Sequence, residues 1–254
     1  MTTFSHQSFV ACLLALVATT VHAEDFAVEN SVLEGKRKLG GSQTIFLDGK
    51  VYDFLADSSE AVVFDLSAGR VVLCDSSRRL RTELTTQELA DFAMRLRDRA
   101  LAGGSDFVKF AAQPTFAQKL DPETNEIVLS SDLLTYRAAA TAPKNADVLR
   151  SYQAFIHWQT QLNAIVNPGA PPPQARLMLN DALAARQLLP ERITMHRTST
   201  LPGTGKTLRA EHDYQWRVSE EQRRRVAELD VLRSDYRLVP IGEYLQAAGV
   251  GSAK

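Results

Sequence analysis

The feature that most constrains the fold is a run of apolar strands and tight turns between residues 26 and 84. Asp48-Gly49 separates SQTIFL from KVYDFLA, and this pair favours a type I′ hairpin because both turn residues need a positive φ. EAVVFDL (60–66) and RVVLCDS (70–76) follow, joined by a short link that ends in glycine. The pattern predicts an antiparallel meander.

Two strands of this meander are apolar on both sides of the pleat. Three consecutive apolar residues occur twice, as Val62-Val63-Phe64 and as Val72-Leu73-Cys74. A strand with one solvated face would alternate apolar with polar residues. We therefore expect both faces of this part of the sheet to be covered.

Four helices are predicted behind the meander, each from its periodicity and its end signals. The first follows Thr85, which has capping-box spacing to Glu88, and ends at Gly103-Gly104. The others span about 146–166, run from near Pro173 to before Pro190, and open at Ser219 with Gln222 at capping-box spacing.

Further strands are expected between and after these helices. Strand character covers 107–141, broken by a turn at 121–125, and a hairpin pairs 192–199 with 207–218. Residues 236–241 suggest a closing strand. The fold class is therefore α+β, a large antiparallel sheet with about four helices, and residues 24–254 are expected to form a single domain.

Residues 1–23 are predicted to be a signal peptide. The apolar run Phe9–Val21 is followed by Val21-His22-Ala23, a small-x-small triplet of the kind that precedes cleavage. No Lys or Arg precedes the run, and its length is well short of the roughly 20 residues that a bilayer span requires. We expect a protein exported to a periplasmic or extracellular location, without a stable membrane anchor.

The net charge and the number of cysteines exclude some classes of partner and of covalent link. The formal net charge is −1, and residues 1–23 contain no Asp, Glu, Lys or Arg, so there is no long-range attraction for nucleic acid. Only Cys74 remains after the predicted cleavage, which excludes an internal disulfide. Cys74 is either an intermolecular or reactive thiol or a small buried apolar residue, and the second interpretation is favoured.

No cofactor is predicted. Leu201-Pro-Gly-Thr-Gly-Lys206-Thr207 looks like the end of a phosphate-binding loop, but Thr200 stands where the first glycine should be. The residues after Thr207 alternate with a strand period instead of opening a helix. We interpret PGTGK (202–206) as a hairpin loop.

The candidate ligand-binding residues are His212, Tyr214 and Trp216. They share the apolar face of the predicted strand, whereas Glu211 and Asp213 point the other way. His212 is therefore either a hydrogen-bonded core histidine or a polar group in an apolar pocket. The spacing of His and Cys supports no metal site, and no G-x-S-x-G elbow supports a catalytic residue.

The stretches ENSVLEGKRK, SQTIFLDGKVYDFL and AVVFDL, at the start of an exported chain, resemble the lipoprotein-carrier family. This resemblance covers residues 26–141 and implies a strongly curved, unclosed half-barrel around helices that binds acyl chains in its hollow. The added helices of 146–189 depart from that family and could fill the hollow. PPPQARLMLN and AEHDYQW also resemble exported proteins of an uncharacterised family, which implies no activity.

Three functions follow as hypotheses. The first is an exported binding protein for a lipid-like or other apolar ligand held near His212, Tyr214 and Trp216. The second is a structural or interaction protein of the cell envelope, in which the helices of 146–189 leave no cavity. The third is a hydrolase with a site assembled from scattered residues, which no motif supports, so we expect a protein that is not an enzyme.

Overall fold

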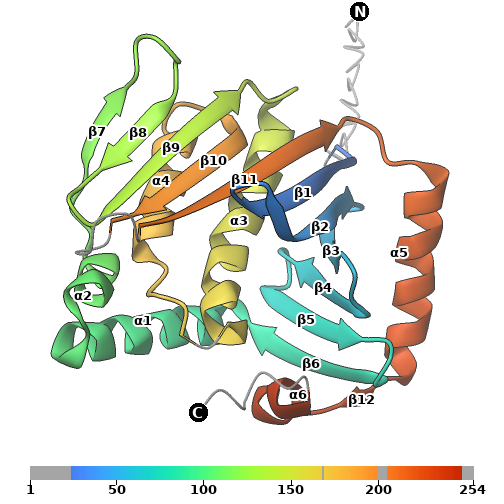
Figure 1. The fold of residues 1–254 in the computed structure, drawn as a ribbon. Helices are drawn as coiled ribbons and strands as arrows, with labels where there is room; N and C mark the ends of the chain where they lie inside the picture. The colour runs from blue at the N-terminus through green and yellow to red at the C-terminus, as the bar shows by residue number, and fades with distance from the viewer. Residues whose placement is uncertain (1–23, 168, 199–204, 248–254) are drawn as a thin grey trace, which may run out of the picture.

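The computed structural model describes residues 24–167, 169–198 and 205–247. The predicted signal peptide and most of the predicted loop 202–206 lie outside these residues. Within them, twelve strands form one sheet in the order β12-β6-β5-β4-β3-β2-β1-β11-β10-β9-β8-β7. The two end strands, β12 and β7, are not paired with each other, so the sheet is open (Figure 1).

The first six strands form the predicted meander: β1 (Phe26–Glu34), β2 (Arg37–Leu47), β3 (Lys50–Leu55), β4 (Glu60–Asp65), β5 (Arg70–Asp75) and β6 (Leu80–Thr85). Both residues of the predicted turn have positive φ, 50° at Asp48 and 74° at Gly49. The hairpin between β2 and β3 is therefore the predicted one.

The rest of the sheet consists of β7 (Ala117–Leu120), β8 (Ile127–Ser130), β9 (Leu134–Thr141), β10 (Leu189–Arg197), β11 (Lys206–Gln215) and β12 (Arg237–Leu238). The helices are α1 (Thr86–Gly103), α2 (Asp106–Ala112), α3 (Ala146–Val166), α4 (Gln174–Ala184), α5 (Glu220–Leu232) and α6 (Ile241–Ala247), with a 3₁₀ turn at Arg233–Asp235. Both predicted capping boxes are present, at Thr85 with Glu88 and at Ser219 with Gln222.

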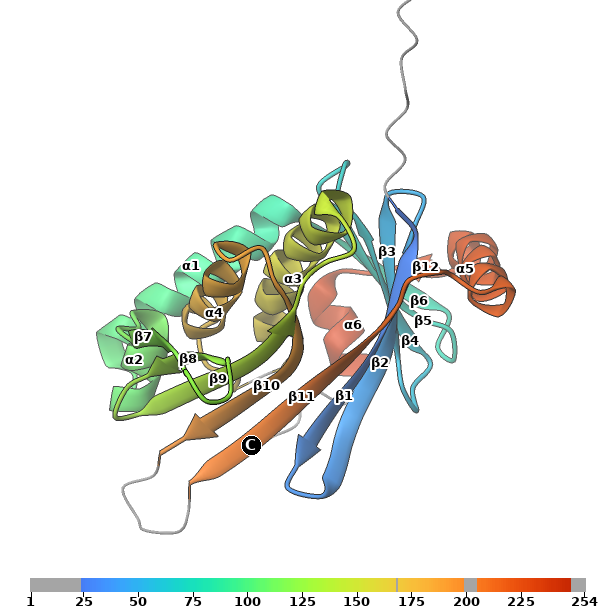
Figure 2. The ribbon, with the colours of Figure 1, turned by 90° about the horizontal axis from the view of Figure 1, so that it is seen from above.

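The sheet bends sharply, so that it has two wings when seen from above (Figure 2). We call β1–β6 with β12 the first wing and β7–β11 the second wing. Helices α1, α3, α4 and α6 lie on the concave side, whereas α5 lies on the outside of the first wing (Figure 2).

Both faces of the first wing are covered, as predicted. On the concave side Phe46 and Phe64 pack with Phe155 of α3. On the outer side Ile45 and Val63 belong to a cluster that includes side chains of α5. The second wing has a cluster of its own, built on β8, β9 and α4.

The helix count and the strand directions differ from the sequence prediction. Residues 106–112 form α2 instead of the start of a strand, because Phe107 and Phe110, three positions apart, both pack on the cluster of the second wing. The predicted strand 236–241 shrinks to β12, which is parallel to β6 and makes the sheet mixed. Pro240 ends it, since proline has no N–H to donate, and α6 follows.

Candidate functional site

A cavity of about 1060 Å³ lies on the concave side of the sheet. Its walls come from α3, from the segment Ala170–Pro173 before α4, and from strands of both wings. The lining is mainly apolar and includes Val28, Val32, Leu55, Leu134, Met195 and Leu208. Helix α3 therefore forms one wall of the hollow without filling it.

A stripe of polar side chains crosses this apolar lining. We call it the polar stripe, and it consists of Asp53 on β3, Thr44 and Ser42 on β2, Asn30 on β1 and His212 on β11. These four strands are neighbours in the sheet, and the register pairs Thr44 with Asp53 and Asn30 with His212. The sheet thus brings residues far apart in the sequence into one row.

Short hydrogen bonds join the polar stripe. The hydroxyl of Thr44 donates to Oδ1 of Asp53 at 2.7 Å. Nδ2 of Asn30 donates to Oγ1 of Thr44 at 2.8 Å and to Oγ of Ser42 at 3.2 Å. Oδ1 of Asn30 lies 2.7 Å from Nδ1 of His212. Every member therefore has at least one partner within the stripe.

The backbone at Asn30 is closely approached by Gly41 on the neighbouring strand. A Cβ atom at position 41 would lie 2.4 Å from the carbonyl oxygen of Asn30, closer than real atoms come. Only glycine fits here without a shift of the backbone. This contact holds β1 and β2 together next to the polar stripe.

Burial shifts the pKa values of two members of the stripe, His212 and Asp53. Burial lowers the pKa of His212 to about 3, with a smaller contribution from the positive charge of Arg176, so the imidazole is neutral near pH 7. Burial raises the pKa of Asp53, and the hydrogen bond from Thr44 opposes that shift. Nε2 of His212 is shielded from solvent and has no hydrogen-bond partner among the described residues.

The structure separates the three candidate residues, of which His212 and Tyr214 lie in β11 and Trp216 directly follows it. His212 lines the cavity, whereas Tyr214 and Trp216 pack against the concave core of the first wing. The rings of Tyr214 and Trp216 stack at 5.3 Å, and the Tyr214 hydroxyl donates to the carbonyl oxygen of Pro190 at 2.9 Å.

The sequence prediction missed Asn30, Thr44 and Asp53. Each is a polar residue at an inward position of an apolar strand, as Asn30 is between Val28 and Val32. That pattern could have marked them, but the hydrogen bonds depend on the strand register, which the sequence alone does not fix.

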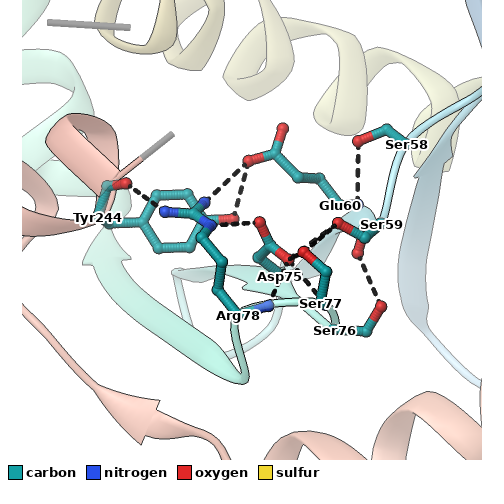
Figure 3. A network of polar contacts seen from close by, with 8 residues as sticks. All are labelled: Ser58, Ser59, Glu60, Asp75, Ser76, Ser77, Arg78 and Tyr244. Atoms are coloured by element: carbon teal, nitrogen blue, oxygen red, sulfur yellow. Dashed lines mark hydrogen bonds and ion pairs between the residues drawn. The ribbon is translucent and has the colours of Figure 1, made fainter. Parts of the chain in front are cut away.

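A second polar network lies at the turn between β5 and β6 (Figure 3). Oδ1 of Asp75 accepts hydrogen bonds from Ser59, Ser77 and the Arg78 amide, and its Oδ2 lies 2.5 Å from Nε of Arg78. Arg78 also donates to the carbonyl oxygen of Tyr244 at 3.0 Å. These contacts hold the pKa of Asp75 far below its usual value and tie α6 to the sheet.

Three other features bear on chemistry. Cys74 is 1% exposed within the outer core, and burial raises the pKa of its thiol to about 11, so the reactive thiolate is not favoured. In the described part of the chain, no group of three or more His, Cys, Asp or Glu side chains could hold a metal ion. No helix among the described residues is long and apolar enough to cross a bilayer.

Comparisons with known proteins identify a weak structural likeness and no family. No protein-family model matches the chain, and no curated protein matches it. Among solved structures, a LolA superfamily protein from Nitrosomonas europaea is 9% identical, with 79% of this chain and 89% of that chain covered and a TM-score of 0.28. At this level of overlap the likeness is weak and bears on the course of the backbone alone.

Proposed function

We propose that this protein is exported and binds an apolar, lipid-like ligand in the cavity between α3 and the two wings. The observation that carries the proposal is the size and chemistry of that cavity. Its volume of about 1060 Å³ is slightly larger than the range of about 300–1,000 Å³ for small-molecule sites. Its lining is mainly apolar, with a few polar groups gathered in one stripe.

The packing of the molecule supports a cavity that is kept open. The concave core fills the first wing with the aromatic rings of Phe26, Phe46 and Phe155 and reaches the second wing at Leu189 and Tyr214, whereas β8, β9 and α4 have a separate cluster. The hollow is open to solvent, so its apolar walls are in contact with water when no ligand is bound. An apolar ligand would remove that apolar surface from water.

The two other functions find less support. A structural or interaction protein of the envelope is expected to have no cavity, because helices would fill the hollow of its sheet. In this structure α3 and Ala170–Pro173 line a cavity instead. A hydrolase needs a general base with a pKa near the working pH, whereas that of His212 is lowered to about 3. No hydroxyl group of the described residues bonds to Nε2 of His212.

The test is a ligand search followed by a cavity-filling variant. Native mass spectrometry of the mature protein, purified gently from its own host, should show a bound lipid-like molecule at one-to-one ratio. Ala210 lines the cavity, and Asp213 is exposed on the opposite face of the same strand. Ala210→Phe should weaken binding of an apolar fluorescent probe at least about tenfold, whereas Asp213→Phe should leave it unchanged.

Two results would contradict the proposal. One is a protein that is purified without a ligand and takes up no apolar probe. The other is equal loss of probe binding in the two variants, which would place the binding outside the cavity.

A further inference from the structure

We propose that the ligand of this cavity carries an uncharged hydrogen-bond donor, a hydroxyl or an amide N–H, which binds Nε2 of His212. This inference rests on the proposed function, because it concerns the polar end of the molecule that the cavity would hold. It is carried by the direction of the hydrogen bonds in the polar stripe.

The amide of Asn30 fixes that direction. Its Nδ2 donates to Thr44 at 2.8 Å, and Thr44 donates onward to the carboxyl of Asp53 at 2.7 Å. The amide oxygen of Asn30 is left facing Nδ1 of His212 at 2.7 Å, and an amide oxygen can only accept. Nδ1 must therefore carry the hydrogen.

The other ring nitrogen is then a bare acceptor. A neutral imidazole protonated at Nδ1 has a lone pair and no hydrogen at Nε2. This atom has no partner among the described residues, and the His212 side chain lines the cavity. Nε2 is shielded from solvent in the unliganded structure, so the ring must shift slightly toward the cavity for a ligand donor to reach it. Buried acceptors are normally satisfied, so a donor brought by the ligand removes a cost that the folded protein otherwise carries.

The positive charge of Arg176 disfavours a positively charged donor next to His212. Its side chain also lines the cavity, and its positive charge contributes to the lowered pKa of His212. An ammonium group placed against His212 would meet the same repulsion. A hydroxyl or amide N–H makes the hydrogen bond without it.

The experiment uses four ligands with the same chain: hexadecanol, hexadecanamide, hexadecyl methyl ether and hexadecylamine. Each competes with an apolar fluorescent probe for the delipidated mature protein. The alcohol and the amide should bind at least about tenfold more tightly than the ether, and more tightly than the amine. In His212→Phe the ratio of alcohol to ether affinity, and of amide to ether affinity, should fall to about one, whatever the substitution does to the affinity for the ether itself.

A second measurement needs no variant. Nitrogen NMR of histidine-labelled protein should show the Nε2 resonance of His212 moving when the alcohol is added and staying in place with the ether. Equal binding of alcohol and ether by the wild-type protein, or an unmoved resonance, would overturn the inference but leave apolar binding intact. Failure of the probe and all four ligands to bind would overturn the proposed function itself.

Discussion

The two wings share one hydrogen-bonded sheet but differ in how deeply their side chains are buried. In the first wing, β3 and β4 each contain four consecutive buried residues and β5 contains five. In the second wing, β7 is exposed at all four positions, and no residue of β11 is fully buried. The same backbone pairing therefore supports a core on both faces in the first wing and a less buried sheet in the second, and both wings contribute to the cavity wall.

The helices account for this difference. The outer face of the first wing packs against Val226 and Leu229 of α5, in addition to the helices on its concave side. The second wing has one cluster of its own, in which α4 covers one face, and joins the concave core of the first wing at Leu189 and Tyr214. Since stabilisation grows with the apolar area removed from water, most of it should come from the first wing.

A matched pair of alanine substitutions is the strongest test of whether the first wing supplies most of the stability. Phe64 in the first wing is fully buried, with its ring 5.2 Å from that of Phe155. Phe107 of α2 is half-buried beneath the second wing, with the guanidinium of Arg197 3.8 Å from its ring centre. Phe64→Ala should lower the free energy of unfolding by about 3–5 kcal/mol, and Phe107→Ala by less than about 2 kcal/mol.

Urea denaturation measures both losses. Equal losses would contradict the inference that the first wing supplies most of the stability.

A second pair of substitutions compares the effect on stability with the effect on binding. Trp216, which directly follows β11, packs on the core with its ring 6.3 Å from that of Phe26, whereas Leu208 of β11 lines the cavity. Trp216→Ala should cost about 2 kcal/mol of stability and change ligand affinity less than about twofold. Leu208→Ala should lower the free energy of unfolding less than Trp216→Ala does, and it should lower the affinity for the ligand more. If Trp216→Ala abolished uptake in a fully stable protein, the cavity would extend to residues that the structure places in the core.

The pH dependence of stability tests the protonation state of His212, which lies where the wings meet. Its pKa is about 3 when folded and about 6.5 when unfolded, so between these values only the unfolded chain binds the proton. Stability contributed by the neutral ring is present above pH 6.5 and is lost as the pH falls. Between pH 6.5 and 5 the loss should be about 1.5 kcal/mol.

His212→Gln removes the titrating group and keeps a polar side chain next to Asn30. Urea denaturation at pH 6.5 and at pH 5 gives the free energy of unfolding at each pH. The difference between the two values should be about 1.5 kcal/mol smaller in the variant than in the wild-type protein. The same slope in both proteins would show that the imidazole of His212 is accessible to protons in the folded state.

The first wing could be predicted from the sequence because its determinants are local. Asp48-Gly49 specifies a turn, and the consecutive apolar residues of β4 and β5 indicate burial on both faces. The capping boxes at Thr85 and Ser219 likewise depend on residues three positions apart. Such signals remain valid whatever lies on the other side of the molecule.

The site could be predicted only in part, because it depends on which elements meet. Alternation in the sequence predicts that His212, Tyr214 and Trp216 share one face, but only the packing of α3 and the core decides which of them borders a cavity. Asn30, Thr44 and Asp53 join through strand register. Helix α2 was missed for a similar reason, because its short apolar run acquires its helical face from contacts with the second wing.

The smallest expected effect concerns α6, which contributes Tyr244 and Leu245 to the cavity lining and is held by the Asp75 network of the first wing. Asp75→Asn removes the charge that pairs with Arg78 and should cost about 1 kcal/mol at pH 7. The pKa of Asp75 is lowered in the folded protein, so this contribution is present above about pH 4 and fades as the pH falls further.

Asp65→Asn is the matched control for this loss. Asp65 occupies another turn of the first wing, where it accepts hydrogen bonds from Ser67 and Ala68, and it has no hydrogen bond or ion pair with the described residues of α6. Hydrogen exchange should show faster exchange of the α6 amides in Asp75→Asn alone. Equal exchange of α6 in both variants would mean that this helix is held by its apolar side chains, and that the first wing supports the cavity without the Asp75 network.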